Sequence, residues 1–299
     1  MWNFDYPKHT SFFAPAHPKS ETWRLVIGLF LAAGVSFFLF GLYSTGIVST
    51  LMFLNISVEA AFSDLGRSPA SLILMLLAFG MFSISVFLVV LTLHRRPIGT
   101  LFGARSRVMP QFGKTCVAMV LLLVAIFVLP PWGYAEPLIP NLAFGPWLSI
   151  LPIALFAVLI QTSAEEILFR GYIQQQLAAR FRSPLVWMVI PSAVFAVGHY
   201  DPVSAGENAV IVVIWAFAFG MFMADLTARS GSLGPAMAVH FINNVSAMLL
   251  VAVPGQLDGA ALYVLPFGMD DVEQMRAWLP VDFVLICISW LAARLAIRA

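Results

Sequence analysis

Charged side chains are scarce in this sequence. Only 10% of its 299 residues are Asp, Glu, Lys or Arg, whereas 61% are hydrophobic; ordinary soluble domains carry about a quarter charged residues. A mean hydropathy of +0.91 exceeds what the core of a soluble chain of this length can enclose. The scarcity of charge therefore excludes a soluble globular domain. It predicts an all-α, polytopic integral membrane protein that lies in a lipid bilayer.

The sequence also lacks an excess of positive or negative charge, and it contains only two cysteines. The net charge is +1, and the basic residues are scattered without aromatic residues between them, which excludes a nucleic-acid partner. Cys116 and Cys287 each lie inside an apolar run, so we interpret them as small buried hydrophobic residues and not as a disulfide or a metal pair. No serine or cysteine has a base at a defined spacing. Covalent acyl-enzyme chemistry therefore has no support.

Long hydrophobic runs, in contrast, are abundant. Eight of them are long enough, or nearly so, to cross a bilayer as helices of about 20 residues. The sequence shows no soluble domain, internal repeat or low-complexity tract, so we predict a single integral membrane domain over residues 1–299. The eight predicted helices are approximately 24–46, 71–94, 113–130, 147–170, 185–200, 208–227, 233–253 and 279–297.

Lysine and arginine are distributed unevenly over the connections between these runs. If eight helices alternate from a cytoplasmic N-terminus, all of the sixteen Lys and Arg residues except Arg67 and Arg276 fall on the cytoplasmic side. Loops that stay in the cytoplasm carry such an excess of positive charge. We therefore expect both the N-terminus and the C-terminus to face the cytoplasm.

Two adjacent carboxylates lie at the end of one hydrophobic run. Glu165 and Glu166 follow an apolar stretch, and Arg170 lies four residues after Glu166, on the same helix face. Charge inside a membrane is costly, and it usually marks a functional site. The structural alternative is a helix end that faces water, with solvated acids and an arginine that anchors the helix. We favour an ion pair in which Arg170 keeps Glu166 charged and oriented.

Two histidines and an asparagine follow on later hydrophobic runs. His199 and Glu165 each lie about seventeen residues from Arg182, one on either side of a predicted helical hairpin. A rise of about 1.5 Å per residue brings them to the same depth. His240 and Asn244 share one face of a later helix. Each could instead be structural, as an interfacial or buried histidine or as an amide that joins helices. Their matching depths predict one polar cavity in the cytoplasmic half of the membrane.

Carboxylates, imidazoles and an amide in one water-accessible cavity suit the hydrolysis of an amide bond. A carboxylate can take a proton from water and return it to the leaving amine. Glu165, His199 and His240 could also hold a divalent metal such as zinc, which would polarise that water. Alternatively, histidine and asparagine side chains can donate hydrogen bonds to the oxyanion. The residues alone leave both versions open.

Three motifs, in order, carry a resemblance to a known family. Glu-Glu-x-x-x-Arg at 165–170, Phe-x-x-x-His at 195–199 and His-x-x-x-Asn at 240–244 resemble the CPBP family of intramembrane proteases. That family includes the CAAX prenyl endopeptidases and the bacteriocin-processing and self-immunity proteins. The resemblance covers about residues 150–252, which would be the catalytic core. It implies an endopeptidase of a bacterial inner (plasma) membrane that cleaves a membrane-associated peptide or protein, prenylated substrates included.

The resemblance also implies roles for the individual residues. The first motif would supply the general base, Glu165, which activates water with the support of Glu166 and Arg170. The histidine of the second motif would help to hold that water or a metal. In the third motif, His240 and Asn244 would stabilise the oxyanion. Members of the family are described both as metalloproteases and as metal-free glutamate peptidases, so the resemblance leaves the zinc ion undecided.

Two other classes of function stay open. A non-catalytic membrane scaffold or a bacteriocin self-immunity protein would use the same polar cluster as a structural network. A proton- or ion-coupled transporter would also bury Glu and His. The sequence shows no inverted repeats with paired broken helices, which argues against the transporter.

Overall fold

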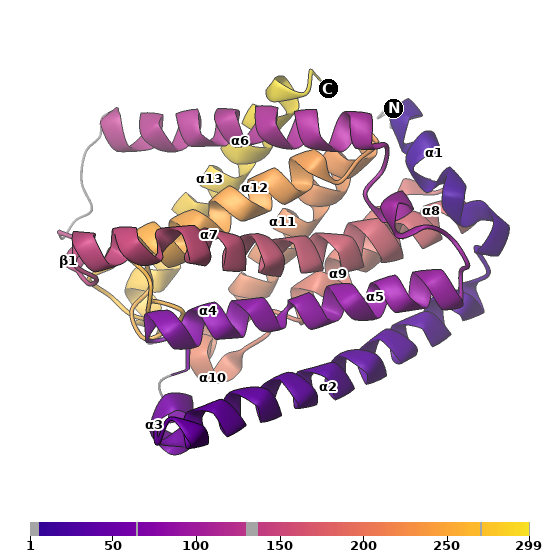
Figure 1. The fold of residues 1–299 in the computed structure, drawn as a ribbon. Coiled ribbons are helices and arrows are strands. Elements are labelled where there is room, and N and C mark those ends of the chain that lie inside the picture. The colour runs from indigo at the N-terminus through magenta and orange to yellow at the C-terminus, as the bar shows by residue number, and fades with distance from the viewer. Residues whose placement is uncertain (1–5, 64, 130–136, 270, 299) are drawn as a thin grey trace.

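The chain folds as a bundle of α-helices, which Figure 1 shows for the computed structural model. The structure describes residues 6–63, 65–129, 137–269 and 271–298. All long elements in these ranges are helices, so the predicted all-α class is confirmed. The main helices are α2 (Thr22–Phe53), α4 (Pro69–Ala78), α5 (Gly80–Thr92), α6 (Arg105–Val128), α7 (Phe144–Glu166), α9 (Ile190–Val197), α11 (Ala209–Ser230), α12 (Gly234–Val245) and α13 (Val272–Ala296).

Six helical segments of the described chain are long and apolar enough to cross a membrane. Two of the eight predicted spans are shorter: residues 185–197 form a short apolar helix, and α12 continues only through the five-residue π-helix η6 (Ser246–Leu250). The eight predicted segments are thus helical over most of their length, but the count of eight full spans is not confirmed. The six long segments, which make the protein an integral membrane protein, are 22–53, 69–92, 105–128, 144–180, 202–230 and 272–296.

The helix that carries the paired glutamates continues beyond Glu166. The π-helix η3 (Ile167–Gln174) and α8 (Gln175–Arg180) extend α7 without a break. Phe181 then leaves helical geometry, with φ −118° and ψ 132°, and the chain reverses into η4 (Leu185–Val189) and α9. The predicted helical hairpin is therefore present. A π-helix is rare, and it occurs most often as a short segment at a functional site.

Small residues let the helices around α7 come close to one another. Gly220 of α11 lies against α9, where an added Cβ would stand 3.0 Å from the Ser192 Cβ. Gly234 of α12 lies against α6, where an added Cβ would stand 2.4 Å from the Val108 carbonyl oxygen. Close approach through small residues is a common way to pack helices in membranes, where association gains nothing from the hydrophobic effect. The first contact holds α11 against α9, and the second holds α12 against α6. Helix α12 also packs against α11 and α7, so these helices form one group around the end of α7.

Large hydrophobic side chains cover the outside of the bundle. Phe30 is 77% exposed, Phe37 is 82% exposed and Leu121 is 63% exposed. Exposed apolar surface of this extent does not suit a soluble monomer. It suits helices whose outer faces contact lipid, as the composition predicts.

The N-terminal segment packs against the end of the helical hairpin. Its first helix, α1 (Pro7–Phe13), buries the side chain of His9, which is 1% exposed. The Nε2 atom of His9 lies 3.4 Å from Nε2 of Gln174. The neighbouring Gln175 donates from Nε2 to the carbonyl oxygen of Phe12 at 2.7 Å. The segment before the first long helix is therefore a part of the fold that touches the continuation of α7.

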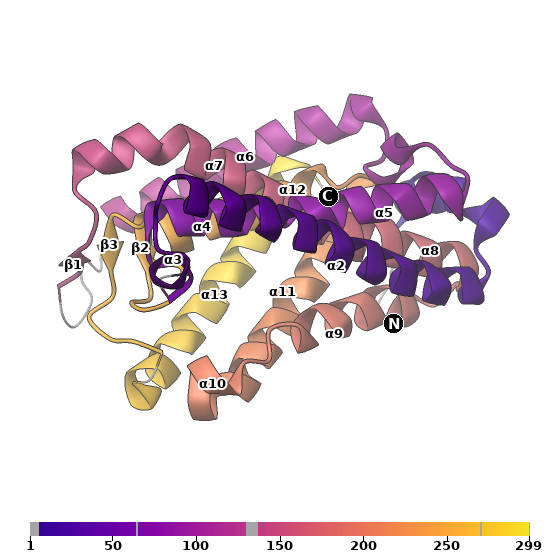
Figure 2. The same ribbon diagram turned by 60° about the horizontal axis from the view of Figure 1, so that its bottom comes forward.

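A small three-stranded sheet lies at the other end of the bundle, as Figures 1 and 2 both show. Its central strand β3 (Tyr263–Val264) pairs antiparallel with β1 (Ile139–Pro140) and parallel with β2 (Val251–Ala252). The sheet joins the connection before α7 to the connection after α12 and leaves the all-α class unchanged. The remaining short elements are η1 (Ala14–Lys19), α3 (Val58–Ser63), η2 (Ile98–Leu101), α10 (Pro202–Ala205) and η5 (Gly206–Asn208).

Two buried histidines near the N-terminal contact make the stability depend on pH. Burial lowers the pKa of His9 to about 3, and burial together with the charge of Arg96 lowers the pKa of His94 to about 4. An unfolded histidine has a pKa of about 6.5, so the unfolded chain takes up protons that the folded chain resists. The free energy of unfolding is therefore unaffected by these two histidines above about pH 6.5. It decreases as the pH falls from about 6.5 toward the folded-state pKa values of about 4 and about 3.

We expect Tm to fall by several degrees between about pH 7 and about pH 4.5 because of this linkage. The double variant His9→Gln/His94→Gln should lose less over the same interval, although it starts from a lower Tm. Thermal unfolding of the detergent-solubilised protein over a series of pH values measures both slopes. Equal slopes in the wild type and the variant would contradict the assignment to these histidines.

Candidate active site

Two neighbouring carboxylates occupy different environments at the end of α7. Glu166 is completely buried, while the side chain of Glu165 keeps 16% of its surface exposed. Consecutive residues of a helix point in different directions, because 3.6 residues complete one turn. One carboxylate is therefore held inside the protein, and the other stays within reach of water.

The buried carboxylate has a matched cation. Arg170 donates from Nη1 to Glu166 Oε1 at 3.0 Å, and its side chain is 1% exposed. Arg170 also donates from Nη2 to the carbonyl oxygen of Gly220 on α11, again at 3.0 Å. The ion pair expected from the i, i+4 spacing is present. It also joins α7 to α11, which the spacing did not indicate.

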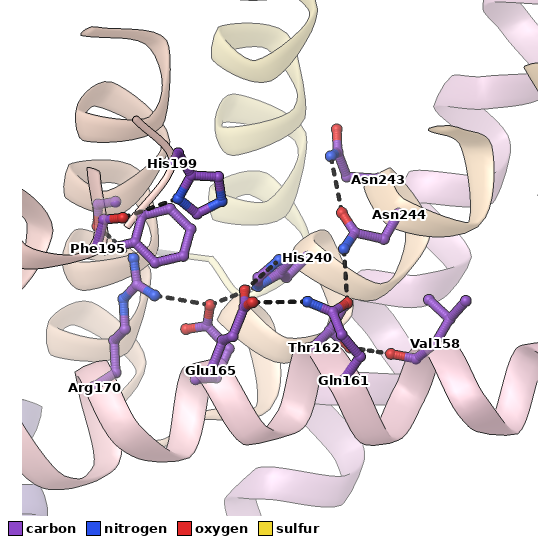
Figure 3. A network of polar contacts seen from close by, with 12 residues as sticks. Val158, Gln161, Thr162, Glu165, Arg170, Phe195, His199, His240, Asn243 and Asn244 are labelled. Atoms are coloured by element: carbon purple, nitrogen blue, oxygen red, sulfur yellow. Dashed lines mark hydrogen bonds and ion pairs between the residues drawn. The ribbon is translucent and has the colours of Figure 1, made fainter. Parts of the chain in front are cut away.

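His240 lies between the two glutamates. Its Nδ1 is 2.8 Å from Glu166 Oε1, and its Nε2 is 3.4 Å from Glu165 Oε2. A carboxylate paired with arginine is only an acceptor, so Nδ1 carries a hydrogen and donates it. Figure 3 shows the imidazole of His240 beside Glu165 above α7. The histidine of α12 thus faces both acids of the first motif, one with each ring nitrogen.

His199 is placed by its own helix and by an aromatic ring. Its Nδ1 is 2.8 Å from the carbonyl oxygen of Phe195, which leaves the Nε2 edge available to a ligand. The Phe195 ring lies 4.4 Å from the His199 ring and 6.2 Å from the His240 ring, between centroids. The guanidinium of Arg170 also lies 5.0 Å from the Phe195 ring. Phe195 therefore packs against side chains of all three motifs, and His199 sits at the edge of the group.

Asn244 reaches the glutamates through a residue that the motifs do not include. Asn244 donates from Nδ2 to Gln161 Oε1 at 2.9 Å, and Gln161 donates from Nε2 to Glu165 Oε1 at 2.8 Å. Both bonds are drawn in Figure 3. Gln161 lies four residues before Glu165, so the same i, i+4 rule that joined Glu166 to Arg170 would have found it. The structure thus brings together five of the six predicted residues through polar contacts, with His199 beside them.

Comparison with known proteins gives a family that the central part of the chain resembles. Residues 146–246 match the model of the type II CAAX prenyl endopeptidase family, described as Rce1-like. That range contains all three motifs. The match supports the resemblance of this region to the CPBP family of intramembrane proteases. The uncharacterised protein YyaK of Bacillus subtilis strain 168 is 26% identical to the chain over 261 residues, which cover 83% of this chain and 84% of YyaK. No solved structure matches the chain.

The side chains of this site are not arranged around a metal position in the structure. Within the described residues, no group of three or more His, Cys, Asp and Glu side chains is placed to hold a metal ion. His240 turns both ring nitrogens toward glutamates, and His199 turns Nδ1 toward a backbone carbonyl. A zinc ion held by Glu165, His199 and His240 therefore stays a prediction.

Proposed function

We propose that the chain is an intramembrane endopeptidase in which Glu165 activates water to hydrolyse a peptide bond of a membrane-associated substrate. One observation carries the proposal: two adjacent carboxylates, one buried and ion-paired and one partly exposed, flank the same imidazole. A structural ion pair needs only Glu166 and Arg170. A second acid beside that pair, kept within reach of water, suits proton transfer.

The hydrolysis divides into two proton transfers at Glu165. As the water oxygen bonds to the scissile carbonyl carbon, one water proton moves to the carboxylate, and the carbonyl electron pair moves onto oxygen. Asn244 and His240 lie on the same side of α7. We assign the N–H groups for that oxyanion to Asn244 Nδ2 and to His240 Nε2, which also carries a hydrogen because it faces the Glu165 carboxylate at 3.4 Å while Nδ1 donates to Glu166. When the C–N bond breaks, Glu165 returns the proton to the leaving nitrogen. The products are a carboxylic acid and an amine, and the acid passes its proton to the amine to give a carboxylate and an ammonium group.

The remaining residues of the site hold this arrangement. Glu166 keeps a fixed negative charge opposite Arg170 and orients His240 through Nδ1. His199 offers Nε2 at the edge of the site, where it can hold the attacking water. The role of each residue thus follows from which of its atoms is already bonded and which is free.

The proposal places the site in the cytoplasmic half of a bacterial inner membrane, with both termini in the cytoplasm. Two contacts support the termini being on one side. Tyr6, near the N-terminus, donates to Asp225 Oδ1 at 2.8 Å, and Trp290 of α13 donates to Asp225 Oδ2 at 2.9 Å. A prenylated C-terminal peptide fits this location, because its lipid keeps the scissile bond at the cytoplasmic surface.

The purified wild type in lipid nanodiscs should cleave a farnesylated C-terminal peptide and leave the same peptide without the lipid intact. Mass spectrometry of the products identifies the bond. A parallel reaction with a chelator separates a metal-dependent reaction from a glutamate-only one, which keeps its rate. If folded wild type cleaves neither this peptide nor a panel of transmembrane peptides, the non-catalytic scaffold becomes the better account.

A further inference from the structure

Gln161 is a buried polar side chain that none of the three motifs includes. It is 5% exposed and lies on α7, one helical turn before Glu165. Its two bonds both go to members of the site, Glu165 and Asn244. The neighbouring Thr162, also buried, bonds instead to the Val158 carbonyl of its own helix. Adjacent polar residues of α7 therefore differ, because Thr162 bonds to the backbone of its own helix and Gln161 bonds to two side chains of the site.

The hydrogen bonds that link Glu165, Gln161 and Asn244 can have only one assignment of donors and acceptors. A carboxylate accepts hydrogen bonds, so Gln161 must turn its NH₂ toward Glu165 and its oxygen toward Asn244. Asn244 must then turn its NH₂ toward Gln161, and its oxygen accepts from Nδ2 of Asn243 at 3.3 Å. Flipping either amide would place two acceptors or two donors face to face. The charge on Glu165 thus fixes the orientation of Asn244 through Gln161.

We propose that Gln161 is a positioning residue of the active site. It holds the carboxylate of Glu165 in place, and it holds Asn244 with its amide nitrogen toward the site. One hydrogen of that nitrogen bonds to Gln161, and the other is left for the developing oxyanion. This inference rests on the proposed function for its kinetic effect, whereas the hold on Glu165 exists without any substrate.

Gln161→Met keeps the volume and removes both hydrogen bonds. We expect kcat to fall about 10- to 100-fold, the loss typical of one bond to a charged group, while KM changes less than about threefold. Gln161→Asn keeps the amide but is one methylene shorter and cannot reach both partners, so its kcat should lie between those of Gln161→Met and the wild type. Thr162→Val, one residue away, should keep the wild-type kcat.

A second measurement needs no proteolysis. Dicyclohexylcarbodiimide labels carboxyl groups within membranes, and the bond from Gln161 Nε2 to Glu165 Oε1 at 2.8 Å holds that carboxylate in place and shields one of its oxygens from the reagent. Mass spectrometry of the digested protein should therefore show faster labelling of Glu165 in Gln161→Met and Gln161→Asn than in the wild type. Thr162→Val should match the wild type.

The outcomes separate the two proposals. Faster labelling of Glu165 together with a lower kcat supports the positioning role. Faster labelling in a protein that cleaves no substrate supports the hold on Glu165 while the proposed function fails. Wild-type labelling and wild-type kcat in folded Gln161→Met would overturn the role of Gln161.

Discussion

Replacing Glu165 by glutamine should lower kcat by about 10²- to 10⁴-fold, the usual contribution of a general base. Glutamine has nearly the same shape, and its side-chain oxygen can still accept the hydrogen bond from Gln161. It cannot take a proton from water, however. The loss should therefore appear in kcat with little change in Tm, as measured by product release and thermal unfolding of the same preparation.

Glu273→Gln is the matched control for this substitution. Glu273 is an exposed carboxylate in the first turn of α13, outside the site, so the same chemical change should leave kcat unaltered. Comparable kcat in the wild type and in Glu165→Gln would remove Glu165 as the base. In that case a different group must activate the water.

Arg170→Met should destabilise the protein by about 3–5 kcal/mol, because it leaves the buried Glu166 without its cation. Glu166 is fully buried, and its atom Oε2 has no hydrogen-bond partner within the described structure, so the protein can offer little compensation. The carbonyl oxygen of Gly220 would lose a donor as well. Denaturant unfolding of the reconstituted protein measures the loss.

The double variant Glu166→Gln/Arg170→Met tests whether the unpaired charge of Glu166 causes the loss of stability in Arg170→Met. Neutralising the stranded carboxylate should recover part of the stability that Arg170→Met loses, since an uncompensated buried charge costs more than a buried amide. Arg276→Met is the control, because Arg276 pairs with Glu207 in an exposed position and should affect stability little. A double variant less stable than Arg170→Met alone would show that packing, and not the stranded charge, sets the cost.

Local patterns predicted the parts of this protein that depend on spacing along one helix. The Glu166–Arg170 ion pair follows from four residues of separation, and the helical hairpin follows from the turn predicted near Arg182. The apolar runs likewise predicted the helices, because a membrane-spanning backbone must satisfy its hydrogen bonds within itself. These rules need no knowledge of how one helix is rotated against another.

Other features of the site depend on that rotation. The sequence did not reveal that His240 would face Glu165 and Glu166 with opposite ring nitrogens, or that Arg170 would also bind a carbonyl of α11. The sequence also did not show which hydrophobic segments form full membrane spans and which form short helices. The length and hydropathy of a segment do not tell how it packs against the neighbouring helices. The small sheet was missed because its two-residue strands are too short to carry a pattern.

The amino-acid sequence by itself determined that the chain lies in a membrane, which segments are helical, and which polar residues share a helix face. Composition and periodicity are enough for this, because lipid excludes charge and the α-helix has a fixed repeat. Only the tertiary structure decided which of the two glutamates is buried and which atom of each partner is free. Those properties depend on close contacts between α7, α9, α11 and α12, which no single helix specifies.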